Sequence, residues 1–152
     1  MKSRHPELAD APPPNAFECT DRVRWSDSDP MGIIFFGAYI RLMGVAESEM
    51  SRALGLPVHE WRLKREVWIP RKALHLEFHS AAELEEEVLI KSWYSRVGTT
   101  AITMRFEFYR ASDRLHRASG SLTVVSVERD VMRPKPLPDD VKELLARFTA
   151  PS

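Results

Sequence analysis

One long segment with helical periodicity, followed by several strand patterns, most constrains how this chain can fold. Apolar residues recur at spacings of three and four from Phe36 to Leu54, and charged residues occupy the other faces. Gly55 stands where the residue after a helix end belongs, and Pro57 prevents continuation. These signals predict a helix over residues 37–54, about 27 Å long at 1.5 Å per residue.

Runs with strand character lie on both sides of this helix. They cover residues 17–25, 67–79, 88–97, 99–109 and 115–128. Pro70 indicates a bulge or an edge early in the second run. Residues 58–66 are polar and predicted to be irregular, and Asp139 begins a terminal amphipathic helix. Short connections between successive strands favour an antiparallel sheet covered by the long helix, which is an α+β fold.

Composition narrows the classes of function and the compartment. Lys and Arg number 22 and Asp and Glu also number 22, so nucleic acid and anionic membranes are not expected as main partners. The single cysteine, Cys19, cannot form an internal disulfide and removes a Cys-based zinc site. The sequence has no long apolar run and no signal-peptide core. We therefore expect a cytoplasmic protein.

The N-terminal residues differ in composition from the rest of the chain. Residues 1–16 carry charges and three consecutive prolines, which predicts a flexible arm in extended geometry without buried contacts. Residues 17–149 are expected to form one domain, because a chain of 152 residues with 43% hydrophobic content can build a single core.

Two acids in an irregular loop precede the long helix. Pro30 keeps Asp29 out of the helical region, and Gly32 permits a backbone conformation closed to other residues. The first turn of the helix offers free N–H groups and a positive dipole end beside these carboxylates. Such an arrangement can hold an anion or polarise a carbonyl oxygen, so we expect a functional site here.

Structural interpretations compete with functional ones at several positions. Asp29 can cap a helix or a turn, and Asp27 is better explained as a residue that holds the loop by Asx-type hydrogen bonds. Tyr39 is expected to pack in the core, although it lies close enough in sequence to line a pocket. His75 and His79 share one strand face, but two histidines without a nearby cysteine indicate a surface or interface pair instead of a metal site.

The acidic loop resembles the signature of the 4-hydroxybenzoyl-CoA thioesterase family of hotdog proteins. In that family D-x-D-x-x-G, an aromatic stretch and a tyrosine open the central helix; here the matching run extends from Asp27 to Tyr39. The resemblance spans about residues 17–148, and its downstream landmarks are Gly55-Leu56-Pro57, Ile69-Pro70, Phe78, Trp93, Arg96 and the proline-rich segment 133–138. It implies the hotdog fold, in which an antiparallel sheet wraps around one long central helix.

The resemblance also implies roles for individual residues. Asp29 matches the catalytic carboxylate, which acts as nucleophile or general base toward the thioester carbonyl. The backbone N–H of Phe36 matches the donor that polarises this carbonyl, and Gly32 matches the glycine that shapes the loop. Phe36 and Ala38 depart from the YbgC-like branch, which has His and often Asn there, and an aromatic residue at 36 is nearer to the aryl-CoA branch. The substrate-binding residues expected are Tyr39, Phe35 and Arg96, the last near the CoA phosphates.

These matches predict an acyl-CoA thioesterase that needs no metal or redox cofactor, with an aryl-CoA such as hydroxybenzoyl-CoA among the candidate substrates. The family implies a homodimer or homotetramer with sites at the subunit interface. A noncatalytic acyl-CoA or acyl-carrier-protein binding module is the alternative, favoured by the loss of polar groups at positions 36 and 38 and opposed by Asp29. A hydratase is a third possibility, weakened because the loop lacks a paired Asp and His.

Overall fold

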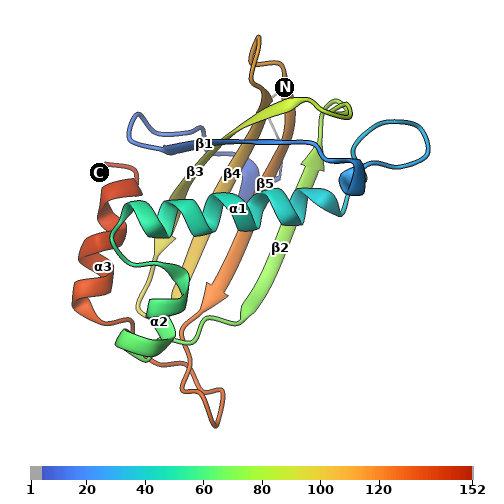
Figure 1. Cartoon of the computed structure of the whole chain (residues 1–152). Helices are drawn as coiled ribbons and strands as arrows, with labels where there is room; N and C mark the ends of the chain where they lie inside the picture. The colour runs from blue at the N-terminus through green and yellow to red at the C-terminus, as the bar shows by residue number, and fades with distance from the viewer. Residues whose placement is uncertain (1–4, 152) are drawn as a thin grey trace.

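Five strands pair into one antiparallel sheet in the computed structural model, which describes residues 5–151 (Figure 1). The strands are β1 (Phe17–Arg22), β2 (Arg71–Phe78), β3 (Glu87–Val97), β4 (Ala101–Arg110) and β5 (His116–Val125). Their order across the sheet is β1-β3-β4-β5-β2, so β1 and β2 are the two edges. The antiparallel pairing and the helices that accompany the sheet confirm the predicted α+β class.

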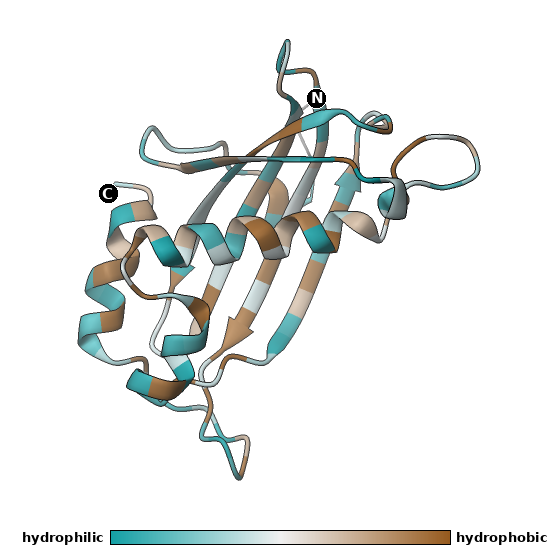
Figure 2. Cartoon of the chain, in the orientation of Figure 1, coloured by the Kyte–Doolittle hydropathy of each residue, from teal (hydrophilic) through white to brown (hydrophobic). Residues whose placement is uncertain are grey.

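Helix α1 (Ala38–Ala53) lies across one face of the sheet (Figure 1). Its buried apolar residues recur at the predicted spacing, and Figure 2 shows hydrophobic residues on its successive turns and along the central strands. Leu42, which is fully buried, and its neighbours share one core with the alternate residues of β4 from Ile102 to Phe108. Gly55 follows the helix with φ of 75°, a conformation that favours glycine. The helix begins and ends within one residue of the predicted bounds.

The connection after α1 is the clearest error of the sequence prediction. Residues 58–66 were expected to be irregular, but Val58–Arg65 forms helix α2. Trp61 is its one buried residue, and the indole Nε1 donates to the carbonyl of Leu56 at 3.1 Å. Because an eight-residue helix anchored by a single side chain shows no apolar repeat, hydrophobic periodicity could not reveal it.

Strand ends differ more from prediction than strand centres. The first strand stops at Arg22 instead of residue 25, because Trp25–Asp27 forms a 3-10 turn that leaves Trp25 82% exposed. The last strand stops at Val125 instead of residue 128. The bulge predicted near Pro70 is confirmed by a register shift between Arg71 and Ala73. The terminal helix is also confirmed, as α3 (Asp139–Leu145), which is followed by a 3-10 turn at Ala146–Phe148.

The described part of the N-terminal segment packs on the sheet face opposite α1. Leu8, in the 3-10 turn Pro6–Leu8, is 4% exposed. Arg105 of β4 donates to the carbonyls of Glu7 at 2.9 Å and Leu8 at 3.1 Å. The expectation that this segment makes no buried contacts is therefore wrong, because Arg105 needs acceptors there; residues 1–4 of the predicted arm lie outside the described residues. No helix within residues 5–151 is long and apolar enough to cross a membrane.

Candidate active site

Arg41 of α1 ties the acidic loop to the helix and to β1. Its Nε donates to Asp27 Oδ1 at 2.8 Å and its Nη2 to Asp27 Oδ2 at 2.5 Å, while Nη1 donates to Asp21 Oδ2 at 2.6 Å. The backbone N–H of Arg24 donates to Asp27 Oδ2 at 2.8 Å. Burial disfavours the charge on Asp27, but the guanidinium and the N–H outweigh it and hold the pKa of this carboxyl below its usual range. The structural role of Asp27 is thus confirmed, although Arg41 and the N–H of Arg24 hold it in place of the expected Asx-type hydrogen bonds.

The tip of the loop is a tight turn. The N–H of Asp29 donates to the carbonyl of Ile33 at 2.9 Å, and the N–H of Gly32 donates to the carbonyl of Asp29 at 3.0 Å. Gly32 has φ of 78°, and a Cβ there would meet nothing within 4 Å, so the backbone conformation and not crowding calls for glycine. The N–H of Ile34 donates to the carbonyl of Ala82 at 2.8 Å, which fixes the loop to the segment before β3.

Asp29 lies half-buried at the start of this turn. Its Oδ1 accepts the N–H of Met31 at 2.8 Å, which is an Asx turn. Its Oδ2 accepts no hydrogen bond from the residues that the structure describes. One carboxylate oxygen is therefore held in place while the other stays available to a ligand or a water molecule.

The start of α1 presents a free backbone donor. The N–H of Phe35 donates to the carbonyl of Asp27 at 2.6 Å, and the N–H of Ala38 donates to the carbonyl of Phe35 at 2.9 Å. Between them, the N–H of Gly37 donates to no acceptor within residues 5–151, and neither does the N–H of Phe36. Since the positive end of the helix dipole lies at the same place, this N–H can stabilise a developing negative charge.

An apolar cavity of about 270 Å³ opens beside this end of the helix. We call it the acyl cavity, after the group that the family resemblance leads us to expect there. Its lining residues are Ile33, Ile34, Phe36, Tyr39, Phe78, His79, Ser80 and Ala81. Ligand pockets range from about 300 to 1,000 Å³, so this volume suits one part of a larger ligand.

Tyr39 brings an unpaired hydroxyl to the wall of the acyl cavity. The residue is 2% exposed, and its ring packs against Phe78 and Phe108 with centroid distances of 5.6 and 5.1 Å. Its hydroxyl is buried without a hydrogen-bond partner among the described residues. Burial raises the pKa of Tyr39 to about 12 against the opposing effect of Arg117, so the hydroxyl remains a donor at neutral pH. A buried donor left unpaired points to a ligand group as its partner.

The predicted site residues are only partly brought together. Phe36 and Tyr39 line the acyl cavity, while Asp29 and Gly32 lie in the turn next to the lining residue Ile33 and are not themselves part of the wall. Phe35 is 48% exposed and lies outside the lining, with its ring 4.6 Å from that of Phe36 between centroids.

Arg96 is distant from the acyl cavity of its own chain. Its Nη2 donates to Thr103 Oγ1 at 3.3 Å. The register of the sheet aligns the lining residue Phe78 of β2 with Ile90 of β3, because successive residue pairs connect them across β5 and β4. Arg96 lies six residues beyond Ile90 along β3. At about 3.3 Å per residue the separation along the strand is about 20 Å. Arg96 is therefore not part of the wall of the acyl cavity in its own chain.

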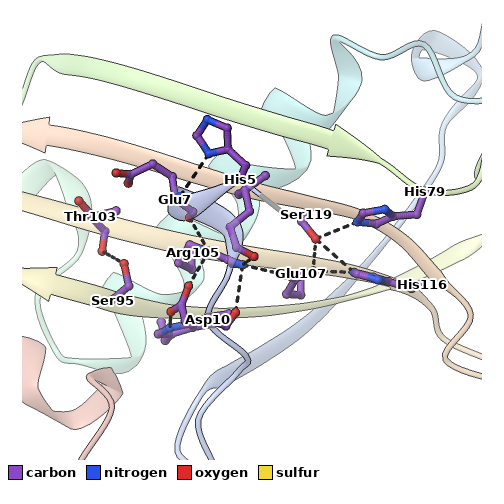
Figure 3. Close-up of polar contacts among 12 residues, drawn as sticks. His5, Glu7, Asp10, His79, Ser95, Thr103, Arg105, Glu107, His116 and Ser119 are labelled. Carbon is purple, nitrogen blue, oxygen red and sulfur yellow. Dashed lines mark hydrogen bonds and ion pairs between the residues drawn. The ribbon is translucent and has the colours of Figure 1, made fainter. Parts of the chain in front are cut away.

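A polar cluster next to the acyl cavity was missed by the sequence analysis. Ser119 Oγ donates to Glu107 Oε2 at 2.6 Å and lies 3.0 Å from His79 Nε2, and His116 Nε2 lies 2.6 Å from Glu107 Oε2 (Figure 3). Burial and the neighbouring His116 hold the pKa of His79 below its usual value. Glu107 lies on β4, His116 and Ser119 lie on β5, and His79 directly follows β2, so only the pairing of these strands in the sheet reveals the cluster. Within residues 5–151 no three His, Cys, Asp or Glu side chains are placed to hold a metal ion.

Comparisons with known proteins agree with this geometry. A family described as the Thioesterase-like superfamily matches residues 23–145. Acyl-CoA thioesterase YbgC of Haemophilus influenzae is 23% identical over 128 residues, which cover 84% of this chain and 93% of that protein.

Solved structures share the fold over nearly the whole chain. A thioesterase superfamily protein from Jannaschia sp. CCS1 has a TM-score of 0.85 at 26% identity, covering 95% of this chain and 100% of its own. A 1,4-dihydroxy-2-naphthoyl-CoA thioesterase from Synechocystis has a TM-score of 0.80 at 14% identity, covering 86% and 96%. The family resemblance recognised in the sequence is confirmed.

Arg41→Gln tests the anchoring of the loop. We expect the free energy of unfolding at pH 7 to fall by about 2 kcal/mol, because the buried Asp27 carboxylate loses its charged donor. A carboxyl whose pKa is lowered in the folded state stabilises the protein fully above its usual pKa of 3.8, and this stabilisation is lost as the pH falls from 3.8 through the lower pKa of the folded state. The difference between wild type and variant in urea unfolding should therefore shrink from pH 5 to pH 3.

Arg52→Gln is the matched control, because Arg52 lies on the same helix with its side chain 63% exposed and paired to Glu49. Its cost should stay below about 0.5 kcal/mol. Equal costs in the two variants, or a cost of Arg41→Gln that does not change with pH, would contradict this role of Arg41.

Proposed function

Because the chain belongs to the Thioesterase-like superfamily, we propose that it hydrolyses an acyl-CoA thioester to a free acid and CoA. Membership of this family makes the chain a thioester hydrolase, as its sequence predicted. The observation that best supports an acyl-CoA substrate is the free N–H of Phe36, which lies at the helix N-terminus in the wall of an apolar cavity. An acyl chain or ring in the cavity would bring its thioester carbonyl to this donor.

The proposed reaction uses the donor and the loop carboxylate together. The carbonyl oxygen accepts the N–H of Phe36, which stabilises the oxyanion of the tetrahedral intermediate. Asp29 either attacks the carbonyl carbon, giving an anhydride that water then hydrolyses, or takes a proton from the attacking water. In both cases the bond to sulfur breaks and CoA leaves as the thiolate. Neither route requires a metal or a redox cofactor.

Tyr39 supports an acyl group that carries a hydrogen-bonding oxygen. Its hydroxyl is an unpaired donor in a mainly apolar wall, and an aromatic neighbour, Phe78, lies beside it. A hydroxylated aryl group, as in a hydroxybenzoyl-CoA, would fill the apolar space and pair with this hydroxyl. We therefore propose an aryl-CoA substrate of this class.

The edge strand β2 supports a dimer with sites at the subunit interface. Leu74 and Phe78 of β2 are 43% and 50% exposed, and Phe36 and Ile40 at the start of α1 are 64% and 54% exposed. Exposed apolar side chains beside an unpaired strand edge favour pairing with another chain. We propose that two copies pair through β2, with each sheet curved around its own α1 as in hotdog proteins. In this arrangement the partner subunit completes the acyl cavity. A homotetramer would join two such dimers.

Asp29→Asn tests the catalytic assignment. With aryl, short-chain and long-chain acyl-CoAs as substrates, release of CoA thiol should fall by about 100 to 10,000-fold for the class that wild type hydrolyses. Phe36→Ala keeps the backbone N–H and should cost much less. Asp113→Asn is the matched control, since Asp113 also accepts a backbone N–H two residues on, from Leu115, in a distant turn.

Equal activity in Asp29→Asn and Asp113→Asn would remove Asp29 from the mechanism. If wild type binds acyl-CoA but releases no thiol from any substrate, the protein is a noncatalytic binding module and not an enzyme. The observation that favours this alternative is that Asp29 lies outside the cavity wall.

Tyr39→Phe separates a ligand-binding hydroxyl from a structural one. Removing an unpaired buried hydroxyl should leave stability equal or raise it by about 1 kcal/mol, measured by urea unfolding. For a hydroxylated aryl-CoA, kcat/KM should fall about tenfold, whereas the unsubstituted benzoyl-CoA should lose little. A parallel loss for both substrates would contradict the proposed contact.

Leu74→Arg tests pairing through β2. The added charge should shift the protein from dimer to monomer in sedimentation velocity, because it cannot be buried at a strand edge without a partner. Leu115→Arg is the control, with the same 43% exposure in the turn between β4 and β5. A dimer that survives Leu74→Arg as well as Leu115→Arg would place the interface elsewhere.

A further inference from the structure

We propose that a second cavity, at the other end of the sheet from the acyl cavity, binds phosphate groups of an anionic ligand. This basic cavity has a volume of about 530 Å³, within the usual range of small-molecule sites. It is lined by Arg62, Leu63, Glu66, Trp68, Glu128, Arg129 and Lys135.

Trp68 organises the cations of the basic cavity. The guanidinium carbon of Arg62 lies 5.5 Å from the indole centroid and that of Arg129 lies 5.0 Å from it. Arg62 comes from α2 and Arg129 from the loop after β5, while Trp68 is held by the N–H of Val127, which donates to its carbonyl at 2.9 Å. The face of the ring attracts each guanidinium by its charge, and the N–H groups that point away from the ring remain available for the bidentate contacts that suit phosphate.

The cations of the basic cavity form no ion pair with a carboxylate of the described residues. Within residues 5–151 no carboxylate lies within 4.0 Å of the charged nitrogens of Arg62, Arg129 or Lys135, although other cations of α2 are paired, Lys64 with Glu60 at 2.8 Å. Lys135 Nζ donates only to a backbone carbonyl, at 3.4 Å.

Two carboxylates, Glu66 and Glu128, also line the basic cavity and moderate its charge. With three cations against two acids, long-range attraction alone would be weak. Selectivity must come from the directed N–H groups of the two guanidiniums, which favours a phosphate or diphosphate over a simple carboxylate.

The position of the basic cavity suggests where its phosphate comes from. Trp68 precedes Phe78, at the acyl cavity, by ten residues, or about 33 Å of extended chain. Antiparallel pairing of two β2 edges would place the start of β2 in one subunit beside its end in the other. The phosphates of a CoA bound in one acyl cavity could then reach the basic cavity of the second subunit; this extension rests on the proposed function, whereas a free nucleotide would need no dimer.

Binding of adenosine 3′,5′-bisphosphate and of pyrophosphate to the full-length protein, followed by isothermal titration calorimetry, tests the site directly. Arg62→Gln and Arg129→Gln should each weaken binding about tenfold or more, the usual value of a charged hydrogen bond. Lys64→Gln removes the same charge from the same helix outside the basic cavity and should leave binding within about twofold of wild type. No binding to wild type, or equal weakening by Lys64→Gln, would overturn the proposal.

The kinetics of the same variants identify the source of the phosphate. If Arg129→Gln raises KM for an acyl-CoA with kcat unchanged and leaves the matching acyl-pantetheine unaffected, the basic cavity binds the nucleotide end of the substrate. If anion binding is lost while KM stays constant, the ligand is a separate nucleotide. Because calorimetry needs no turnover, the basic cavity can be verified even if the thioesterase assignment fails.

Discussion

The contact of Arg41 with Asp27 and Asp21 is the interaction on which the site depends. The side chain of Asp27 accepts hydrogen bonds from Arg41 of α1, and its carbonyl accepts the N–H of Phe35. One residue therefore fixes the loop to the helix and accepts the last backbone hydrogen bond before α1. The next N–H, that of Phe36, is left free at the cavity. A structural acid thus positions the donor, and the second acid of the loop, Asp29, has one oxygen that accepts no hydrogen bond from the described residues.

Local patterns predicted the parts of the fold that carry a long repeat. α1 and the centre of β4 follow from apolar spacing, because both bury one face against the same core. Helix α2 could not be predicted, since Trp61 alone anchors it. The contacts of residues 5–16 were missed for a different reason: Arg105 stands on the predicted polar face of its strand, and only the folded sheet shows that this face is covered by the N-terminal segment.

The same division applies to the sites. The acidic loop was recognisable because its residues are contiguous from Asp27 to Tyr39. The unpaired hydroxyl of Tyr39 was not, because its isolation depends on distant strands. The basic cavity joins Arg62 and Arg129, which are 67 positions apart in sequence and meet at one indole ring. Arg96 is the opposite case: the family resemblance suggested it as a binding residue, but it lies away from the acyl cavity of its own chain.

The most direct test of thioester hydrolysis at this site is a crystal structure with an acyl-CoA ketone analogue, in which a methylene group replaces the thioester sulfur. The carbonyl oxygen should lie about 2.7 to 3.1 Å from the backbone nitrogen of Phe36. The Asp29 carboxylate should lie within about 3.5 Å of the carbonyl carbon or be joined to it through one water. An acyl group outside the acyl cavity, or a carbonyl turned away from Phe36, would contradict this mechanism.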